Sequence, residues 1–268
     1  MPHPLDEYPI HQAPVSMRYF DTSDRNVYDR CIMHLVSDDG ALQFAHGLGV
    51  YPHLGVIDAY VTARSRDDLV STRASGALHD NRLDQRVGPI RLEVVRPLEE
   101  LRVICDGPAE GVQCDLTYTA AFPAIDEALH KRRRGNHLIL EGCRFAQGGR
   151  WNGSIVAAGV EHAVRDLTGA RDRSWGTRPS GQADPVGRWT PQAGEGTWWC
   201  WIPLRFDDFF LMFVLEEDPD GFRTINDAYR VWPAGAGRPV EQFGFPEVRI
   251  TYRSGTRYPL RAELALRG

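Results

Sequence analysis

Hydrophobic and polar residues alternate with a period of two along much of the chain, which is the pattern of half-buried β-strands. Between residues 112 and 120 the polar positions separate an apolar series made of Val112, Cys114, Leu116, Tyr118 and Ala120. The same alternation recurs at residues 101–105 and 248–252. The sequence therefore predicts strands at these places.

Turn signals separate the alternating stretches. Dipeptides that readily supply a positive φ occur at residues 39–40, 148–149, 220–221 and 254–255, and each of them contains a glycine. The stretch from Ala124 to Arg134 has amphipathic spacing, with Pro123 before it and Gly135 after it, and it predicts one short helix.

Many short strands with little helix predict antiparallel sheets that form barrels or sandwiches. Residues 165–196 are rich in Gly, Arg, Pro and Asp and interrupt the strand pattern, which is typical of a boundary between domains. We therefore expect an all-β protein with two antiparallel β domains. The first spans residues 1–165, and residues 166–268 contain an interdomain loop and the second domain.

Charge and cysteine content narrow the class of protein. The 268 residues have a net charge of -5, which disfavours a nucleic-acid binder, and the basic run from Lys131 to Arg134 is typical of a solvated turn. Five cysteines lie in apolar stretches without zinc-site or disulfide spacing, which indicates buried thiols in a reducing compartment. With no secretory leader and no membrane-spanning apolar run, a soluble cytoplasmic protein is expected.

The motifs of several common chemistries are missing from the sequence. The glycines of GLGVYPHLG, residues 47–55, do not have the spacing of a dinucleotide-binding loop. There is no Walker-type loop, no G-x-S-x-G elbow and no H-E-x-x-H motif. His46 and His53 are close enough to suggest a metal, but no carboxylate stands at a suitable spacing, so we expect no metal site.

Asp58 is the first candidate for chemistry. It interrupts a strand that is apolar on both faces, and it shares its face with Val56 and Tyr60. Burial raises the pKa of an unpaired carboxyl group, and a raised pKa suits a general acid at neutral pH. The alternative is a structural Asp that binds a loop amide or an arginine such as Arg64 or Arg66.

Aromatic residues gather near position 200. Trp199 and Trp201 share one face of a predicted strand, and Trp198 lies on the other. Indole rings can line an apolar ligand cavity and stabilise a developing cation. They also fill ordinary hydrophobic cores, which is the competing interpretation.

The segment ARDRSWGTRP, residues 170–179, combines Asp172 and Trp175 with three arginines. The adjacent Arg171 and Arg173 predict a lowered pKa for Asp172, which suits an ion-pair hub better than a proton donor. The segment is therefore predicted to be an interdomain latch, with a catalytic loop as the alternative. Glu161 and His162 precede it and form either an acid/base pair or a surface strand end.

The segments GGRWNGSIVAAGVEHAV, RDRSWGTRP and WWCWIPL resemble the lipocalin-like superfamily of carotenoid hydratases, kievitone hydratase and Diels–Alderases. The resemblance implies two lipocalin-like β domains, a cavity for an unsaturated hydrophobic molecule and no organic cofactor. The family's central motif matches Asp172, Ser174, Trp175 and Gly176, whereas Arg173 stands where a histidine is common. The implied second domain is short here, so we expect it to be abbreviated or completed in a homo-oligomer.

The expected function is an acid-catalysed hydratase, dehydratase, isomerase or cyclase acting on a terpenoid or polyketide. Asp58 is the preferred acid, with Glu161 and His162 as alternatives, and Asp172 and Arg173 support it. The residues expected to contact substrate are Tyr51, His53, Tyr60, Trp175, Trp199 and Trp201. The alternative is a carrier that binds a hydrophobic small molecule without converting it.

Overall fold

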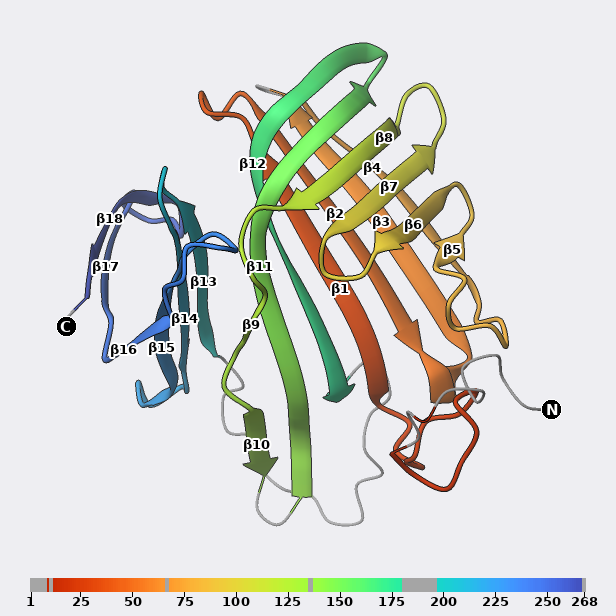
Figure 1. Ribbon diagram of the computed structural model, residues 1–268, viewed down its shortest axis with the longest axis horizontal. Helices are drawn as coiled ribbons and strands as arrows, with labels where there is room; N and C mark the ends of the chain where they lie inside the picture. Colours follow the sequence, from red (N-terminus) through yellow and green to blue (C-terminus); the bar gives the residue numbers. More distant parts are fainter. Residues whose placement is uncertain (1–8, 10–11, 66–67, 135–136, 180–196, 267–268) are drawn as a thin grey trace. The chain divides into compact units, whose positions relative to one another are not determined.

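The computed structural model describes residues 9, 12–65, 68–134, 137–179 and 197–266. Contacts divide the chain into two compact units, residues 1–185 and 186–268. The described part of each unit is built of antiparallel strands, with one short 3-10 helix, η2 (Pro52–Leu54), in the first (Figure 1). The predicted all-β class is confirmed. No helix in the described ranges is long and apolar enough to cross a membrane.

A twelve-stranded sheet forms the first unit, and its main path runs in the order β4-β3-β2-β1-β12-β11-β8-β7-β6-β5. The strands of this unit are β1 (Val27–Val36), β2 (Leu42–Tyr51), β3 (Val56–Ser65), β4 (Asp68–Ala77), β5 (Arg86–Val87), β6 (Ile90–Arg96), β7 (Glu100–Asp106), β8 (Val112–Ala120), β9 (Ile125–Asp126), β10 (His130–Arg134), β11 (His137–Ala157) and β12 (Val160–Thr177). Strands β9 and β10 both pair with β11, away from the main path.

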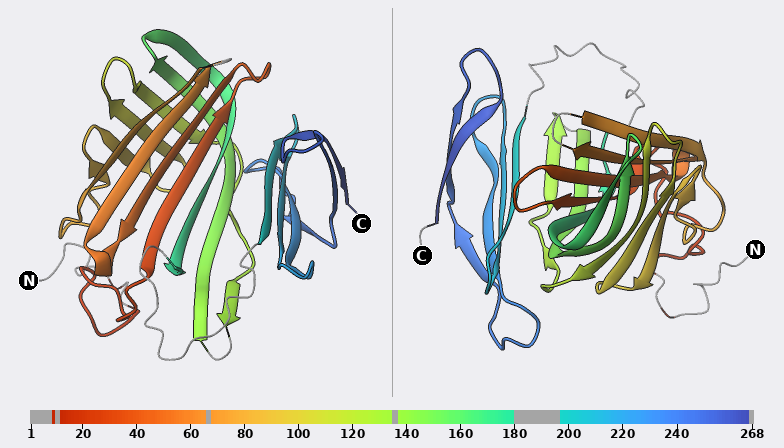
Figure 2. Two further views of the ribbon diagram at one scale, coloured as in Figure 1. Left: turned by 180° about the vertical axis from the view of Figure 1, so that it is seen from behind. Right: turned by 90° about the horizontal axis from the view of Figure 1, so that it is seen from above.

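The sheet of the first unit curls into a nearly closed antiparallel barrel. Strands β5–β8 lie across from β1–β4 in Figure 1, and Figure 2 shows the same curl from behind and from above. The two ends of the path meet where β3 contacts β5 and β6 and where β4 contacts β5. The curled sheet therefore has an inner face, turned toward the barrel axis, and an outer face.

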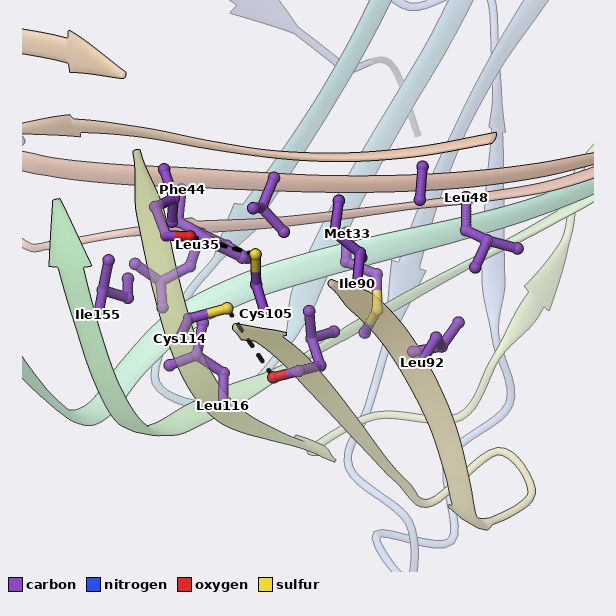
Figure 3. Close-up of a cluster of buried hydrophobic side chains, with 14 of the residues drawn as sticks. Met33, Leu35, Phe44, Leu48, Ile90, Leu92, Cys105, Cys114, Leu116 and Ile155 are labelled. Carbon is purple, nitrogen blue, oxygen red and sulfur yellow. Dashed lines mark hydrogen bonds between the residues drawn. The ribbon is translucent and has the colours of Figure 1, made fainter. Parts of the chain in front are cut away.

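Apolar side chains fill the inner face. Figure 3 shows Met33, Leu48, Ile90 and Leu116 meeting from opposite walls of the barrel, as the period-two pattern predicts. Trp151 is fully buried, and its Nε1 donates a hydrogen bond of 2.9 Å to the His34 carbonyl. The middle of the barrel is thus a packed core and not a ligand cavity.

Two of the turn and boundary predictions are wrong. Gly148 and Gly149 lie inside β11 and not in a turn. Close packing accounts for a glycine in this strand, since an added Cβ at Gly149 would lie 2.6 Å from Thr119 O. Residues 170–177 are not an interdomain loop, because they continue β12 and pair with both β1 and β11. The boundary expected after residue 165 therefore cuts through a strand, and the first unit extends to residue 185.

The helix expected from Ala124 to Arg134 is also absent. The described residues of this stretch form β9 and β10, which pair with β11. Pairing with a 21-residue strand outweighs the weak helical preference of so short a segment. The turns predicted at residues 39–40, 220–221 and 254–255 are confirmed, since each lies in a turn between paired strands.

The second unit contains two open sheets. A four-stranded sheet has the order β13-β14-β15-β16, and β17 pairs with β18 in a two-stranded sheet. Their bounds are β13 (Trp198–Arg205), β14 (Phe210–Glu217), β15 (Arg223–Val231), β16 (Glu241–Gly244), β17 (Glu247–Tyr252) and β18 (Pro259–Ala265). Met212 and Leu215 are fully buried in β14, a central strand. Among the described residues, this unit forms no closed barrel.

Candidate functional site

A hollow of about 740 Å³ lies on the outer face of β1–β4. Its lining consists of Arg30, Cys31, Ile32, Gly47, Leu48, Gly49, Tyr51, Asp58, Ala59, Tyr60, Thr62, Arg73, Ala74 and Ser75. We call this hollow the outer groove. It contains three of the predicted site residues, Tyr51, Asp58 and Tyr60.

Two glycines of β2 create the floor of the outer groove. Gly47 pairs with Tyr60 and Gly49 pairs with Asp58 in the register of β2 and β3. A methyl group at Gly47 would come within 2.7 Å of Tyr60 Cζ, and one at Gly49 within 2.8 Å of Tyr51 Oη. The missing side chains let the Tyr60 ring lie over Gly47 of the neighbouring strand and let Tyr51 lie over Gly49 of its own strand. Gly47 and Gly49 of the segment GLGVYPHLG thus shape this groove.

Asp58 holds a half-buried carboxyl group in the groove. Burial raises its pKa, and the positive charge of Arg30 works in the opposite direction. Among the described residues Asp58 forms no salt bridge, so Arg64 is not its partner. Arg66, the other arginine considered, lies outside the described residues. The predicted direction of the Asp58 pKa is confirmed.

Asp172 lies on the same outer face, in line with the groove. The register places it opposite Ile32 of β1, which pairs with Gly47, which in turn pairs with Tyr60. Burial raises the pKa of Asp172, and Arg144 is the strongest of the positive charges that oppose the rise. The predicted lowering is wrong, because Arg171 and Arg173 leave the strand on the opposite face and burial dominates.

Asp172 belongs to a polar cluster that the sequence did not indicate. Arg144 Nε lies 3.6 Å from Asp172 Oδ2, and Arg144 Nη1 lies 3.3 Å from Glu127 Oε2. The Glu127 side chain is fully buried, and His130 Nε2 lies 3.9 Å from it. Both residues come from the stretch predicted to be a helix, so their contact with β11 was missed. The role of ion-pair hub is nevertheless consistent with this geometry.

Arg173 and Trp175 point to the inner face, away from the outer groove. Arg173 pairs with the buried Cys31, and its Nη2 lies 3.0 Å from Asp29 Oδ1. Trp175 is 39% exposed and lies edge-on to Phe145, with ring centres 6.3 Å apart. The period of two therefore separates these residues from Asp172.

The remaining candidates lie elsewhere. Glu161 and His162 pair with Val156 and Ile155 near the β11–β12 turn, and His162 is ten residues from Asp172 along β12, about 33 Å at 3.3 Å per residue. They are not part of this site. His53 is exposed in η2 and does not line the groove.

Trp199 and Trp201 lie in β13 of the second unit, at positions that alternate with the buried Cys200. Their side of this strand is thus opposite to the one that carries Cys200 into the core. The described residues contain no group of three or more His, Cys, Asp or Glu side chains placed to hold a metal ion.

The fold and the sheet order define the class of protein, an all-β protein with a nearly closed antiparallel barrel in its first unit. Residues 3–268 match the family described as "Family of unknown function (DUF8625)", and the chain belongs to that family. A search of the curated proteins finds no match.

Two solved structures support the resemblance in fold. Kievitone hydratase from Nectria haematococca aligns with a TM-score of 0.57 and 16% identity, over 90% of this chain and 73% of the hydratase chain. CghA with Sch210972 aligns with a TM-score of 0.50 and 13% identity, over 78% of this chain and 58% of the CghA chain. The predicted resemblance to kievitone hydratase is confirmed at the level of fold.

Proposed function

We propose that the outer groove is the active site of a cofactor-independent enzyme that hydrates, dehydrates or isomerises a carbon–carbon double bond in a small molecule. The proposal is supported above all by Asp58, a half-buried carboxyl group with a raised pKa in a hollow of about 740 Å³. That volume is in the range of small-molecule sites. The hydratase among the proteins of similar fold fits the proposal.

The lining of the groove favours an oxygenated substrate over a bare hydrocarbon. Arg30 and Arg73 contribute positive charge, which disfavours a free carbocation next to them. The same guanidinium groups, with the hydroxyl groups of Tyr51 and Tyr60, can stabilise negative charge on a substrate oxygen. We therefore infer a polyketide-like molecule whose double bond is conjugated to a carbonyl group, in preference to an unsubstituted terpenoid.

In the hydration direction, the oxygen of a water molecule bonds to the β-carbon of the double bond, and the electron pair of that double bond moves onto the conjugated carbonyl oxygen. Protonated Asp58 donates its proton to the α-carbon as the carbonyl group re-forms, and the added water then returns one proton to the Asp58 carboxylate. The sum is the addition of one water, and the acid is regenerated. Charge that builds on the conjugated oxygen during the reaction faces Arg30. Dehydration follows the same steps in reverse.

The test begins with mass spectrometry of any compound that copurifies with the protein, followed by incubation with oxygenated polyketides and terpenoids. A product that differs by the mass of one water, or an isomer of equal mass, is expected. Asp58→Asn should lower turnover by at least about a hundredfold and leave binding nearly unchanged. Wild-type turnover should fall as pH rises through the Asp58 pKa, because the protonated acid is the active form.

Asp106→Asn is a matched control, since this carboxylate is exposed at the end of β7 and lies outside the groove. Full turnover in Asp58→Asn would contradict the acid mechanism and point to a cyclase that only orients its substrate. Binding without any conversion would point instead to a carrier.

The free buried thiols suit a reducing compartment, so we place the reaction in the cytoplasm.

A further inference from the structure

A second, smaller cavity lies at the mouth of the barrel, on the inner face. It has a volume of about 170 Å³ and is lined by Met17, Phe20, Asp29, Cys31, Leu48, Val50, Arg82, Leu83, Gln85 and Arg173. Asp29 and Arg173 leave β1 and β12 on the face opposite to that of Arg30 and Asp172. We call it the mouth cavity. Its charged residues lie on the face of the sheet opposite to the outer groove, and Cys31 and Leu48 line both hollows.

The charged residues of the mouth cavity are incompletely paired. Arg173 lies 3.0 Å from Asp29 and donates a hydrogen bond of 3.3 Å to Gln85. Arg82 Nε is buried and has no hydrogen-bond partner among the described residues. Such groups are rare in folded proteins because each costs free energy. Two guanidinium groups face one carboxylate, so the wall carries one net positive charge.

A segment before β1 covers this cavity. Arg82 Nη2 donates a hydrogen bond to the Met17 carbonyl, and its guanidinium lies 4.3 Å from the centre of the Phe20 ring. Arg18 Nη1 lies 3.3 Å from Asp80 Oδ2 just outside the cavity. These contacts fix Met17 and Phe20 as part of the wall. The cavity therefore has a defined cover and a defined size.

The rest of the lining limits the ligand to a short molecule with an apolar part. Leu48 and Val50 are buried core residues of β2, and they contribute apolar surface opposite the charged residues. A volume of about 170 Å³ is below the range of roughly 300–1,000 Å³ that is typical of drug-sized ligands, so the cavity suits a smaller molecule. A ligand with one anionic end and a short aliphatic chain matches this lining.

We propose that the mouth cavity is a second ligand site, which binds a short-chain monocarboxylate with its carboxylate on Arg82 and its alkyl chain on Leu48 and Val50. The site is independent of the function proposed for the outer groove. The competing explanation is that a water molecule accepts from Arg82 Nε. A direct binding measurement separates the two explanations.

The experiment titrates butyrate into the full-length protein by isothermal calorimetry, with butyramide as the neutral analogue and sodium chloride as the ionic-strength control. We expect butyrate to bind and to raise the melting temperature in proportion to its concentration. Butyramide should bind at least about tenfold more weakly, because it lacks the charge that the guanidinium recognises.

Three variants are expected to change the affinity for butyrate in different ways. Arg82→Gln should weaken butyrate binding at least about tenfold, and Asp29→Asn should strengthen it severalfold because a repelling carboxylate is lost. Arg86→Gln, a matched change at a residue whose side chain is 61% exposed outside the cavity, should leave the affinity unchanged.

Arg82→Gln can weaken butyrate binding either by removing a contact to the ligand or by loosening the segment that covers the cavity. A loosened cover only weakens binding, so tighter butyrate binding by Asp29→Asn supports direct charge recognition. It also keeps the test decisive if Arg82→Gln fails to fold. The proposal is overturned if butyrate does not bind, if butyramide binds equally well, or if Asp29→Asn binds butyrate no better than wild type. Loss of turnover in Asp58→Asn with intact butyrate binding would show that the two sites act separately.

Discussion

His46 is a buried histidine whose titration should be measurable in the stability of the protein. Its Nδ1 lies 3.1 Å from the Tyr60 carbonyl, so Nδ1 carries the proton and donates. Burial lowers its pKa to about 4, against about 6.5 in an unfolded chain. The unfolded chain therefore binds a proton first as pH falls, and folding loses up to about 3 kcal/mol between these two values.

His46→Asn keeps an N–H donor but removes the titration, so the difference in stability between about pH 7 and about pH 4.5 should shrink by about that amount. Urea unfolding at each pH measures it. The change in unfolding free energy with pH is decisive and not its absolute value, since the smaller side chain destabilises the core at every pH. His130, whose pKa is also lowered to about 4, titrates in both proteins and cancels. An unchanged slope would show that His46 is not the group responsible.

The sequence predicted single residues well where burial alone decides, and poorly where several charges compete. Asp58 was identified because it interrupts an apolar strand, and its pKa has the predicted direction. For Asp172 the neighbours in sequence, Arg171 and Arg173, suggested the wrong sign. Adjacent residues of a strand point to opposite faces, so the charges that matter come from other strands, and Arg144 is the largest of them.

At the scale of elements, the long strands β11 and β12 depend on a close approach at Gly169. An added methyl group there would meet Trp151 Nε1 and the His34 carbonyl, the two partners of a buried hydrogen bond. Neither the indole nor the backbone can move freely in the packed core. We expect Gly169→Ala to destabilise the protein by about 3 kcal/mol, measured by urea unfolding.

Gly244→Ala is the control for this substitution. Gly244 is also a strand glycine, in β16, and an added methyl group there meets nothing within 4 Å. Its effect should be within about 0.5 kcal/mol of zero. Equal losses in the two variants would indicate a general cost of changing strand glycines and would contradict the specific role of the Trp151 contact.

Elements were predictable where alternation is regular, and β8 matches its predicted residues from Val112 to Ala120. They were not predictable where long-range pairing overrides local preference. Gly148 and Gly149 of β11 looked like a turn, and the glycines of β12 contributed to the expected domain boundary, although several of them allow a neighbouring strand or side chain to approach closely. The segment with Glu127 looked helical because its partner, β11, follows it in the chain and its pairing leaves no trace in local spacing.

At the scale of the whole molecule, the curled sheet turns one alternating pattern into two separate environments. Val61 is fully buried on the inner face of β3, whereas Tyr60 lines the outer groove. The alternation predicted which residues share a face. It could not predict which face is packed and which is hollowed, because that depends on the curl and on strands that meet only at its closure.

The packed interior also determines which thiols can react. Cys31, Cys105, Cys114 and Cys200 are buried, and Cys143 is exposed, which corrects the expectation that all five are buried. Burial raises the pKa of Cys31 to about 11, so its thiolate is scarce as well as inaccessible.

Iodoacetamide should therefore add one group to the native protein, at Cys143, and five after unfolding, counted by intact mass. The Cys143→Ser variant should give no adduct in the native state. After unfolding it should give four adducts, one fewer than the five of the wild type. Rapid labelling of a second thiol under native conditions would mean that one of the packed cores opens, and the two-faced sheet on which both proposed sites depend would then need revision.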